Sequence, residues 1–123
     1  MTRRLNISLW VMQLALAFFA LAAGYTHGIM PLDQAAKMAP WTASLSPAFV
    51  RFIGYSELAA GVGLVLPAAT GILPWLTPLA AAGFGFIMLC AIPFHIMRGE
   101  SRVIGMHIVV LALSLIVAVK RRP

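Results

Sequence analysis

Cysteine is almost absent from this 123-residue sequence, in which Cys90 is the only one. A single cysteine excludes an intrachain disulfide, a CxxC dithiol and a cysteine-rich zinc or iron–sulfur site. The sequence also lacks P-loop, GxGxxG, GxSxG, HExxH and haem-attachment motifs. The chain therefore offers no ready-made redox or hydrolytic centre, and its sequence leaves open whether it is an enzyme.

Charged residues are also scarce, at 10% of the chain, whereas 62% of the residues are apolar. Ordinary soluble domains contain about 25% charged and roughly 45–50% apolar residues. This composition excludes a soluble globular protein and predicts a single integral membrane domain in a lipid bilayer. Nine basic residues and three acidic ones give a net charge of +6, but five of the nine lie at Arg3, Arg4 and 120–122. Because no basic surface with base-contacting side chains remains, we expect no nucleic-acid partner.

Long uncharged runs predict four membrane spans. The first run has 22 residues, which at about 1.5 Å per residue crosses a hydrocarbon core of roughly 30 Å. We expect an all-α integral membrane four-helix bundle with up-down topology, because short loops join the runs. The predicted spans cover about 5–26, 47–66, 78–97 and 103–119.

Proline divides the second and third spans. Ser46 followed by Pro47, and Thr77 followed by Pro78, are each typical of an N-cap and a first helical residue. Pro67 is expected to end the second span. The linker that follows is therefore predicted to be a tight, uncharged turn.

An even number of spans places both termini on one side of the membrane. Five basic residues lie on that side and four lie on the other, so the positive-inside rule favours cytoplasmic termini. The first run allows one alternative, a cleaved secretory signal, because Arg3 and Arg4 precede an apolar stretch that ends in 20–22.

The only long loop joins the first two spans, from His27 to Pro47. It contains a short amphipathic stretch that starts at Asp33 and stops before Pro40. We expect a short interfacial helix here, with Asp33 as its N-cap.

Each predicted span carries its polar and small residues on one face, at steps of three or four residues. In membranes, small residues mark helix contacts and ionisable residues mark interior positions. We therefore expect all four faces to turn inward. The four faces are Gln13, Ala17, Ala20, Gly24 and His27; Gly54, Glu57 and Gly61; Ala81, Gly85, Met88, Ile92 and His95; and His107, Leu111, Ser114 and Ala118.

The depth of these residues predicts a ligand-binding pocket that opens toward the charged loops. The three histidines lie at one level near those loops, and Glu57 lies roughly 15 Å deep by helical rise. Trp41 is expected in the lid of the pocket and Glu57 at its floor. The predicted ligand-binding residues are Glu57, His95, His107, His27, Gln13, Trp41 and Arg51.

Simpler roles remain open for the same residues. Glu57 could form a structural hydrogen bond with Gln13 or a backbone carbonyl, and the histidines could contact lipid headgroups, His27 most readily. No metal ligand is assigned, because three separate helices would have to converge. Cys90 lies on the opposite face of its helix from His95 and is expected to face lipid or to pack.

Several stretches in order resemble one family. They are 18–24, 38–41, 52–58, 63–74, 76–81 and 88–95. Because these stretches occur in this order, the chain resembles the DoxX-like proteins over nearly its whole length. These are small bacterial membrane proteins with four spans. The family's usual Gly-x-x-Lys at the end of the first span is Gly24-Tyr-Thr-His27 here.

The resemblance implies a bacterial cytoplasmic (inner) membrane location, with relatives linked to quinone-dependent sulfur oxidation, to membrane redox complexes or to assembly of other membrane proteins. One hypothesis is a redox-associated membrane subunit that binds a quinone, without a covalent bond, or another small apolar ligand, and has a membrane or soluble redox partner. The alternative is a non-catalytic scaffold or assembly factor that contacts a membrane partner through Gly54, Gly61 and Gly85. The oligomeric state stays open, a homo-oligomer included.

Overall fold

The computed structural model describes residues 1–122, which form α-helices and short 3₁₀ helices (η). Four stretches are long and apolar enough to cross a membrane, at Arg3–Gly28, Pro47–Thr70, Leu76–Met97 and Ser101–Lys120. The prediction of an all-α, four-span bundle is therefore confirmed. In chain order the elements are α1 (Arg3–Gly28), α2 (Leu32–Met38), η1 (Pro40–Ser44), α3 (Pro47–Gly63), α4 (Leu66–Thr70), α5 (Leu76–Met97), η2 (Ser101–Val103) and α6 (Ile104–Lys120).

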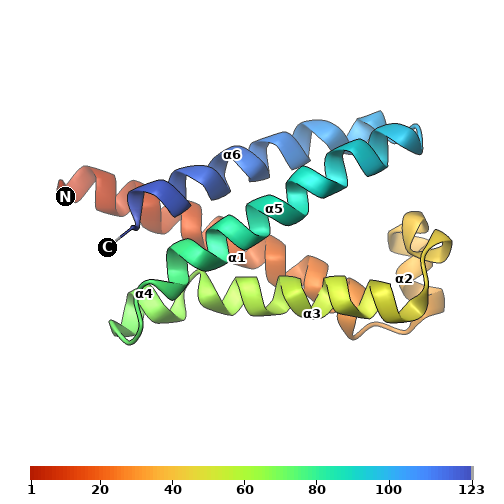
Figure 1. The fold of residues 1–123 in the computed structure, drawn as a ribbon, viewed down its shortest axis with the longest axis horizontal. Helices are drawn as coiled ribbons and strands as arrows, with labels where there is room; N and C mark the ends of the chain where they lie inside the picture. Colours follow the sequence, from red (N-terminus) through yellow and green to blue (C-terminus); the bar gives the residue numbers. More distant parts are fainter. Residues whose placement is uncertain (123) are drawn as a thin grey trace.

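The long helices form two closely packed pairs, α1 with α3 and α5 with α6, and contacts between the pairs are fewer. α1 begins and α6 ends at one end of the bundle, whereas α2 lies at the other end (Figure 1). α5 passes close to α3 beside α4 and then diverges from it toward the α2 end (Figure 1). The two pairs are therefore splayed apart where the charged loops lie.

Glycine brings α1 and α3 into backbone contact. A Cβ atom added to Gly54 would collide with the backbone of Gly28, and one added to Gly24 would lie 2.7 Å from Cγ of Leu58. Gly61 lies against Leu21 in the same way. Small residues allow this close approach in membrane helices, where van der Waals packing is a main source of helix association.

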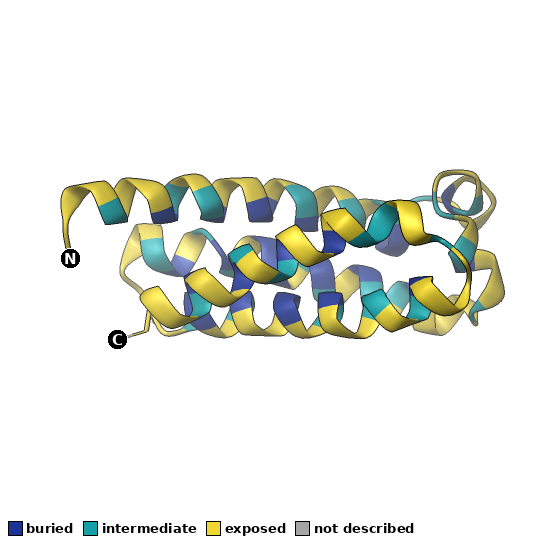
Figure 2. Ribbon diagram, turned by 90° about the horizontal axis from the view of Figure 1, so that it is seen from above, coloured by how far each residue is buried: buried dark blue, intermediate teal, exposed yellow. Residues whose placement is uncertain are grey.

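The four predicted inward faces are buried or half-buried, while large apolar side chains cover the outside of the bundle. Buried positions follow the inner sides of the helices (Figure 2). In water such an apolar surface would promote association, so its natural surroundings are lipid tails.

Pro67 does not end the second span, contrary to the expectation. α3 stops at Gly63, and after a break the chain continues as α4, with Pro67 in its first turn. Proline is tolerated there because the first-turn N–H groups have no partner within a helix. Its missing N–H nevertheless leaves the carbonyl of Gly63 without an intrahelical donor.

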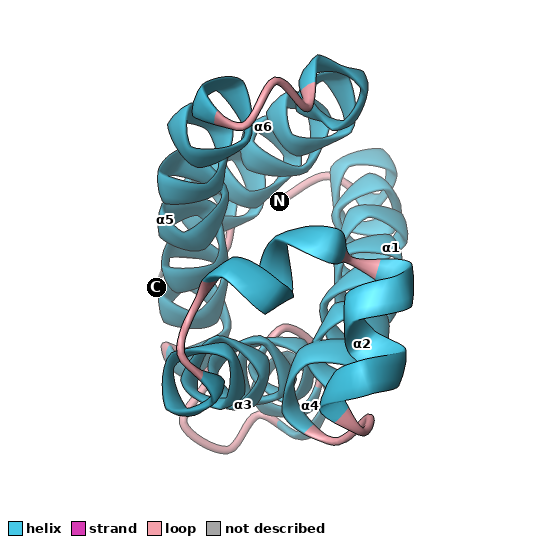
Figure 3. Cartoon of the chain, turned by 90° about the vertical axis from the view of Figure 1, so that its right-hand side faces the viewer, coloured by secondary structure: helices cyan, strands magenta, loops and turns pink. Residues whose placement is uncertain are grey.

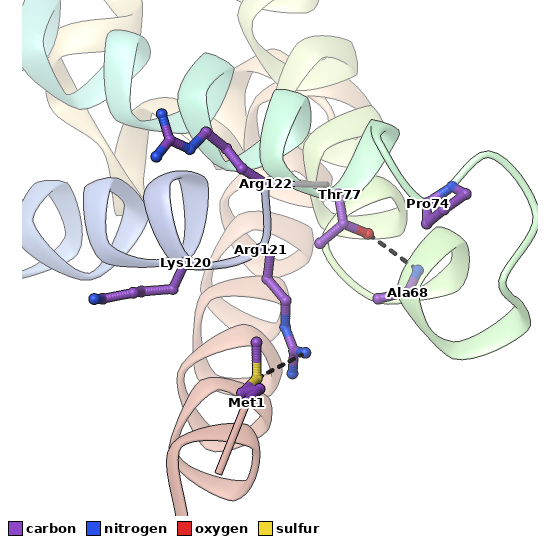
Figure 4. A pocket seen from close by; sticks show the side chains of 7 residues that line it. All are labelled: Met1, Ala68, Pro74, Thr77, Lys120, Arg121 and Arg122. Carbon is purple, nitrogen blue, oxygen red and sulfur yellow. Dashed lines mark hydrogen bonds between the residues drawn. The ribbon is translucent and has the colours of Figure 1, made fainter.

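Side chains of other helices repair this break. Thr77 Oγ1 donates to the carbonyl of Gly63 at 2.9 Å and accepts from the N–H of Ala68 at 3.1 Å. Figure 4 shows the Thr77 hydroxyl directed at Ala68. Gln13 Nε2 donates to the carbonyl of Leu64 at 2.8 Å. These two carbonyls and the N–H of Ala68 are therefore satisfied within the bundle.

Two of the predicted caps are wrong. Thr77 lies inside α5, whose N-cap is Trp75, because the Thr77 side chain is used at the α3–α4 break. The N-cap of α2 is Pro31, and Asp33 lies in the first turn, where a carboxylate still favours the helix dipole. The Ser46 cap is confirmed, since its hydroxyl accepts from the N–H of Phe49 at 3.3 Å.

Candidate functional site

A cavity of about 670 Å³ lies between the splayed helix pairs. Its lining comes from all elements except α4 and is mostly apolar and aromatic. The segment between α1 and α3 lies across the space that the long helices enclose at this end (Figure 3). The polar residues of the lining are Thr26, His27, Glu57, His95, Glu100 and His107.

His27 and Glu57 form a buried pair in this cavity. Nδ1 of His27 and Oε1 of Glu57 share a hydrogen bond of 2.6 Å. The pair forms because His27 lies between the glycines of α1 that touch α3, and Gly54 lies one turn before Glu57 on α3. The alternative Glu57–Gln13 hydrogen bond is therefore wrong, because Gln13 bonds to Leu64 and Arg121 and Glu57 bonds to Nδ1 of His27.

Trp41 of η1 covers the cavity from the loop side. Its ring contacts three others, with centroid distances of 4.8 Å to His27, 5.9 Å to Phe94 and 6.1 Å to His95. The indole thus lies between α1 and α5 at the end where these helices diverge. This placement agrees with its expected position in a lid.

His95 and His107 lie on the α5–α6 side, with ring centroids 4.8 Å apart. Nδ1 of His107 donates to the carbonyl of Val103 at 2.7 Å, because a carbonyl only accepts. Nδ1 of His95 is 3.0 Å from Oε1 of Glu100. Within residues 1–122 the Nε2 atoms of both rings have no hydrogen-bond partner, so each can bind a further polar group at the cavity.

A charged cluster at the rim was missed by the sequence interpretation. Arg98 Nε donates to Oε1 of Glu100 at 2.9 Å, and Arg98 Nη1 donates to the hydroxyl of Ser44 in η1 at 2.9 Å. The hydrogen bond with His95 lowers the pKa of Glu100, against an opposing effect of burial and with further lowering by Arg98. The charged loop directly after His95 was the signal that could have indicated this cluster.

Two predicted ligand contacts lie outside the cavity lining. Arg51 Nη1 donates to the carbonyls of Met30 at 2.8 Å and His27 at 3.3 Å, so it satisfies backbone acceptors at the end of α1. Gln13 lies near the other end of the bundle, where its Oε1 accepts from Arg121 Nε at 2.7 Å. Neither side chain is among those that line the cavity.

A smaller pocket of about 200 Å³ lies beside Arg121. In Figure 4 Arg121 points toward Met1, while the side chains of Lys120 and Arg122 extend away from it. Partial burial lowers the pKa of Arg121, although its guanidinium stays charged near neutral pH. This pocket shares no lining residue with the large cavity.

Cys90 is exposed on α5 and also lines the large cavity. The expected outward position is therefore correct, but the cavity reaches the outer surface of the bundle at this residue. No group of three His, Cys, Asp or Glu side chains within residues 1–122 is arranged to hold a metal ion.

Comparison with known proteins gives one match. No curated protein and no solved structure shows significant similarity to the chain. The sequence model of the DoxX-like family matches residues 11–117, a range that contains every residue of the large cavity. The protein is therefore a multi-pass membrane protein that belongs to the DoxX-like family.

Proposed function

We propose that this protein is a ligand-binding membrane subunit associated with a redox system, and that its ligand is a small apolar molecule with a polar head, specifically a quinone. The observation that carries the proposal is the composition of the cavity lining, in which a few polar groups lie among mostly apolar side chains. Three imidazoles and two carboxyl groups lie in an otherwise mostly apolar lining. Ligand sites of about 300–1,000 Å³ commonly combine apolar walls with a few placed polar groups.

The chemistry of the polar groups supports a quinone or its reduced form. A neutral imidazole whose Nδ1 donates presents a lone pair on Nε2, which suits a hydroxyl group. A protonated imidazole presents an N–H instead, which suits a carbonyl oxygen. The same ring can therefore hold either form of such a head group, with its protonation state deciding which one.

The proposed role requires other proteins and a particular membrane. The polar side chains of the cavity exchange protons but do not carry electrons, so a membrane or soluble redox partner would exchange electrons with the ligand. We place the protein in a bacterial inner membrane with both termini in the cytoplasm, because basic residues are more numerous at the terminal end.

The alternative scaffold function has less support. The glycines expected to contact a partner pack inside the bundle: Gly54 against Gly28, Gly61 against Leu21, and Gly85 near Ser114. These faces are therefore not available to a second membrane protein.

Tryptophan fluorescence tests the proposed ligand. The variant Trp10→Phe/Trp75→Phe retains Trp41 as its only tryptophan, and Trp41 lines the cavity. We expect decylubiquinone to quench its fluorescence saturably in mild detergent, and His95→Asn/His107→Asn to weaken this binding. Extraction of the wild-type protein should also release a co-purifying apolar molecule. Quenching that never saturates, with no co-purifying molecule, would contradict the proposal.

A further inference from the structure

On the side of the water-facing loops the cavity is covered by η1, although Met38 and Pro40 of its lining are exposed there. Trp41 lies against His27 and His95, and thus bridges α1 and α5. The hydrogen bond from Arg98 to Ser44 holds η1 to the segment that follows α5. Arg98 is itself held by Glu100, and its guanidinium carbon lies 5.8 Å from the ring centroid of Phe94. A ligand that passed between η1 and the end of α5 would have to break these contacts.

The same cavity is open sideways, between α3 and α5. At this gap four of its lining residues are also exposed on the outside of the bundle: Phe49 at 50%, Phe52 at 65% and Phe86 at 65%, together with Cys90. Side chains that line a cavity and face outward at once mark its opening. This is also where Figure 1 shows α5 diverging from α3.

The opening lies within the apolar part of the chain. α3 and α5 both belong to membrane-spanning stretches, and the residues at the opening are aromatic or weakly polar. The rings of Phe49 and Phe52 are stacked, with centroids 6.5 Å apart. On the opposite side, between α1 and α6, the exposed lining residues are only Ala22 and Met106. The α3–α5 side is therefore the larger of the two lateral openings.

We propose that the ligand enters and leaves from the bilayer through the gap between α3 and α5, and that it is an amphiphile whose apolar tail remains in this gap. This inference rests on the proposed ligand-binding function and adds its route and ligand class. The head group reaches the imidazoles beneath η1, while the tail lies against Phe52, Phe86 and Cys90. A molecule without a tail makes no van der Waals contacts with this apolar surface, and such contacts are a main source of packing energy in lipid.

The test compares two probes and two positions on α5. Decylubiquinone carries a ten-carbon tail and ubiquinone-0 carries none. Cys90→Phe narrows the opening, and Ala82→Phe places the same ring on an exposed position of α5 that does not line the cavity. All variants retain Trp41 as the only tryptophan, and association is followed by stopped-flow quenching in phosphatidylcholine vesicles at equal probe concentration in the bilayer.

We expect decylubiquinone to bind about tenfold more tightly than ubiquinone-0, because its tail packs against the rings at the opening. Cys90→Phe should slow association of decylubiquinone several-fold, and Ala82→Phe should leave the rate unchanged. Phe52→Ala, which widens the opening, should raise the rate and guards against a folding defect in the narrowed variant. Ser44→Ala, which frees η1, should have no effect on the rate.

The outcomes distinguish a failure of the lateral route from a failure of the proposed ligand-binding function. If Ser44→Ala speeds association while Cys90→Phe and Phe52→Ala do not change it, the ligand passes through the loop side and the lateral route is overturned. If neither probe binds saturably to the wild-type protein, the proposed function fails and the route with it. Equal affinity for the two probes would overturn the ligand class alone.

Discussion

His27 and Glu57 are thirty residues apart in the sequence, yet Nδ1 of one lies 2.6 Å from Oε1 of the other inside the bundle. A carboxylate at this depth costs on the order of 3 kcal/mol on insertion scales, and the imidazole offsets this cost by hydrogen bonding and by carrying a compensating charge when protonated. The pair also connects the helix contact to the cavity, because the glycines that bring α1 and α3 together lie beside both residues.

We expect the His27–Glu57 pair to behave as one unit. His27→Asn and Glu57→Gln should each destabilise the protein by about 1–3 kcal/mol, because each removes one member of a buried hydrogen bond. The double variant should lose less than the sum, since residues in contact are not additive. The unfolding free energies of the two single variants and the double variant can be measured in mild detergent, with circular dichroism as the signal. Strict additivity would mean that the two side chains act separately.

The glycine contact between α1 and α3 should be the most sensitive position to added volume. Gly54→Ala forces a methyl group into the backbone of Gly28, so we expect a loss of about 2–3 kcal/mol in unfolding free energy. Gly83→Ala is the matched control, because no atom lies within 4 Å of the added Cβ. It should stabilise α5 by about 0.5–1 kcal/mol, since alanine favours helix over glycine. Equal effects at the two positions would contradict the close packing.

The hydroxyl of Thr77 should contribute to the stability of the folded protein, because it bonds to two backbone groups at the α3–α4 break. Thr77→Val keeps the shape but leaves the carbonyl of Gly63 and the N–H of Ala68 without their partner, which should cost about 1–3 kcal/mol. Thr26→Val removes only a bond to a carbonyl of its own helix and should cost much less. Thermal unfolding of both variants in the same detergent is the measurement, and a neutral Thr77→Val would show that the break does not need its hydroxyl.

The contacts of η1 should weaken at low pH. The folded-state pKa of Glu100 is lowered, so its ionised form is stabilised above the unfolded value of about 4.3 and this stabilisation is lost as pH falls through the lowered value. Protonation weakens the bonds from Arg98 and His95, and with them the hold on Ser44. After correction for the intrinsic exchange rate, the protection of the amides of 41–44 against hydrogen exchange should therefore fall below about pH 4. Glu100→Gln should show fast exchange already at neutral pH, and a pH response identical to that of the wild type would refute this link.

The orientation of the bundle can be measured with single cysteines in a Cys90→Ser background. We expect Thr2→Cys to be protected from a membrane-impermeant reagent outside the cell and Ser101→Cys to react, because the positive-inside rule favours the more basic end in the cytoplasm. The reverse pattern would invert the proposed topology.

Much of the architecture followed from local properties of the sequence. The number of spans depends on the length of uncharged runs, and the inward faces depend on helical spacing, so both were predicted. The Ser46 cap was predicted for the same reason, since a cap involves only neighbouring residues. The level of the three histidines followed from counting residues along helices that alternate in direction.

The contacts between helices were decided by the tertiary structure alone. The glycine contact of α1 and α3 directs His27 to Glu57, and the divergence of α5 from α3 opens the cavity sideways, although Cys90 had only been expected to face outward. Gln13 lies outside the cavity lining, where it donates to the carbonyl of Leu64 at the α3–α4 break and accepts from Arg121, 108 residues away. Helical spacing determines which face a residue occupies, but the separation of two helices and their rotation about their axes depend on the packing of the whole bundle.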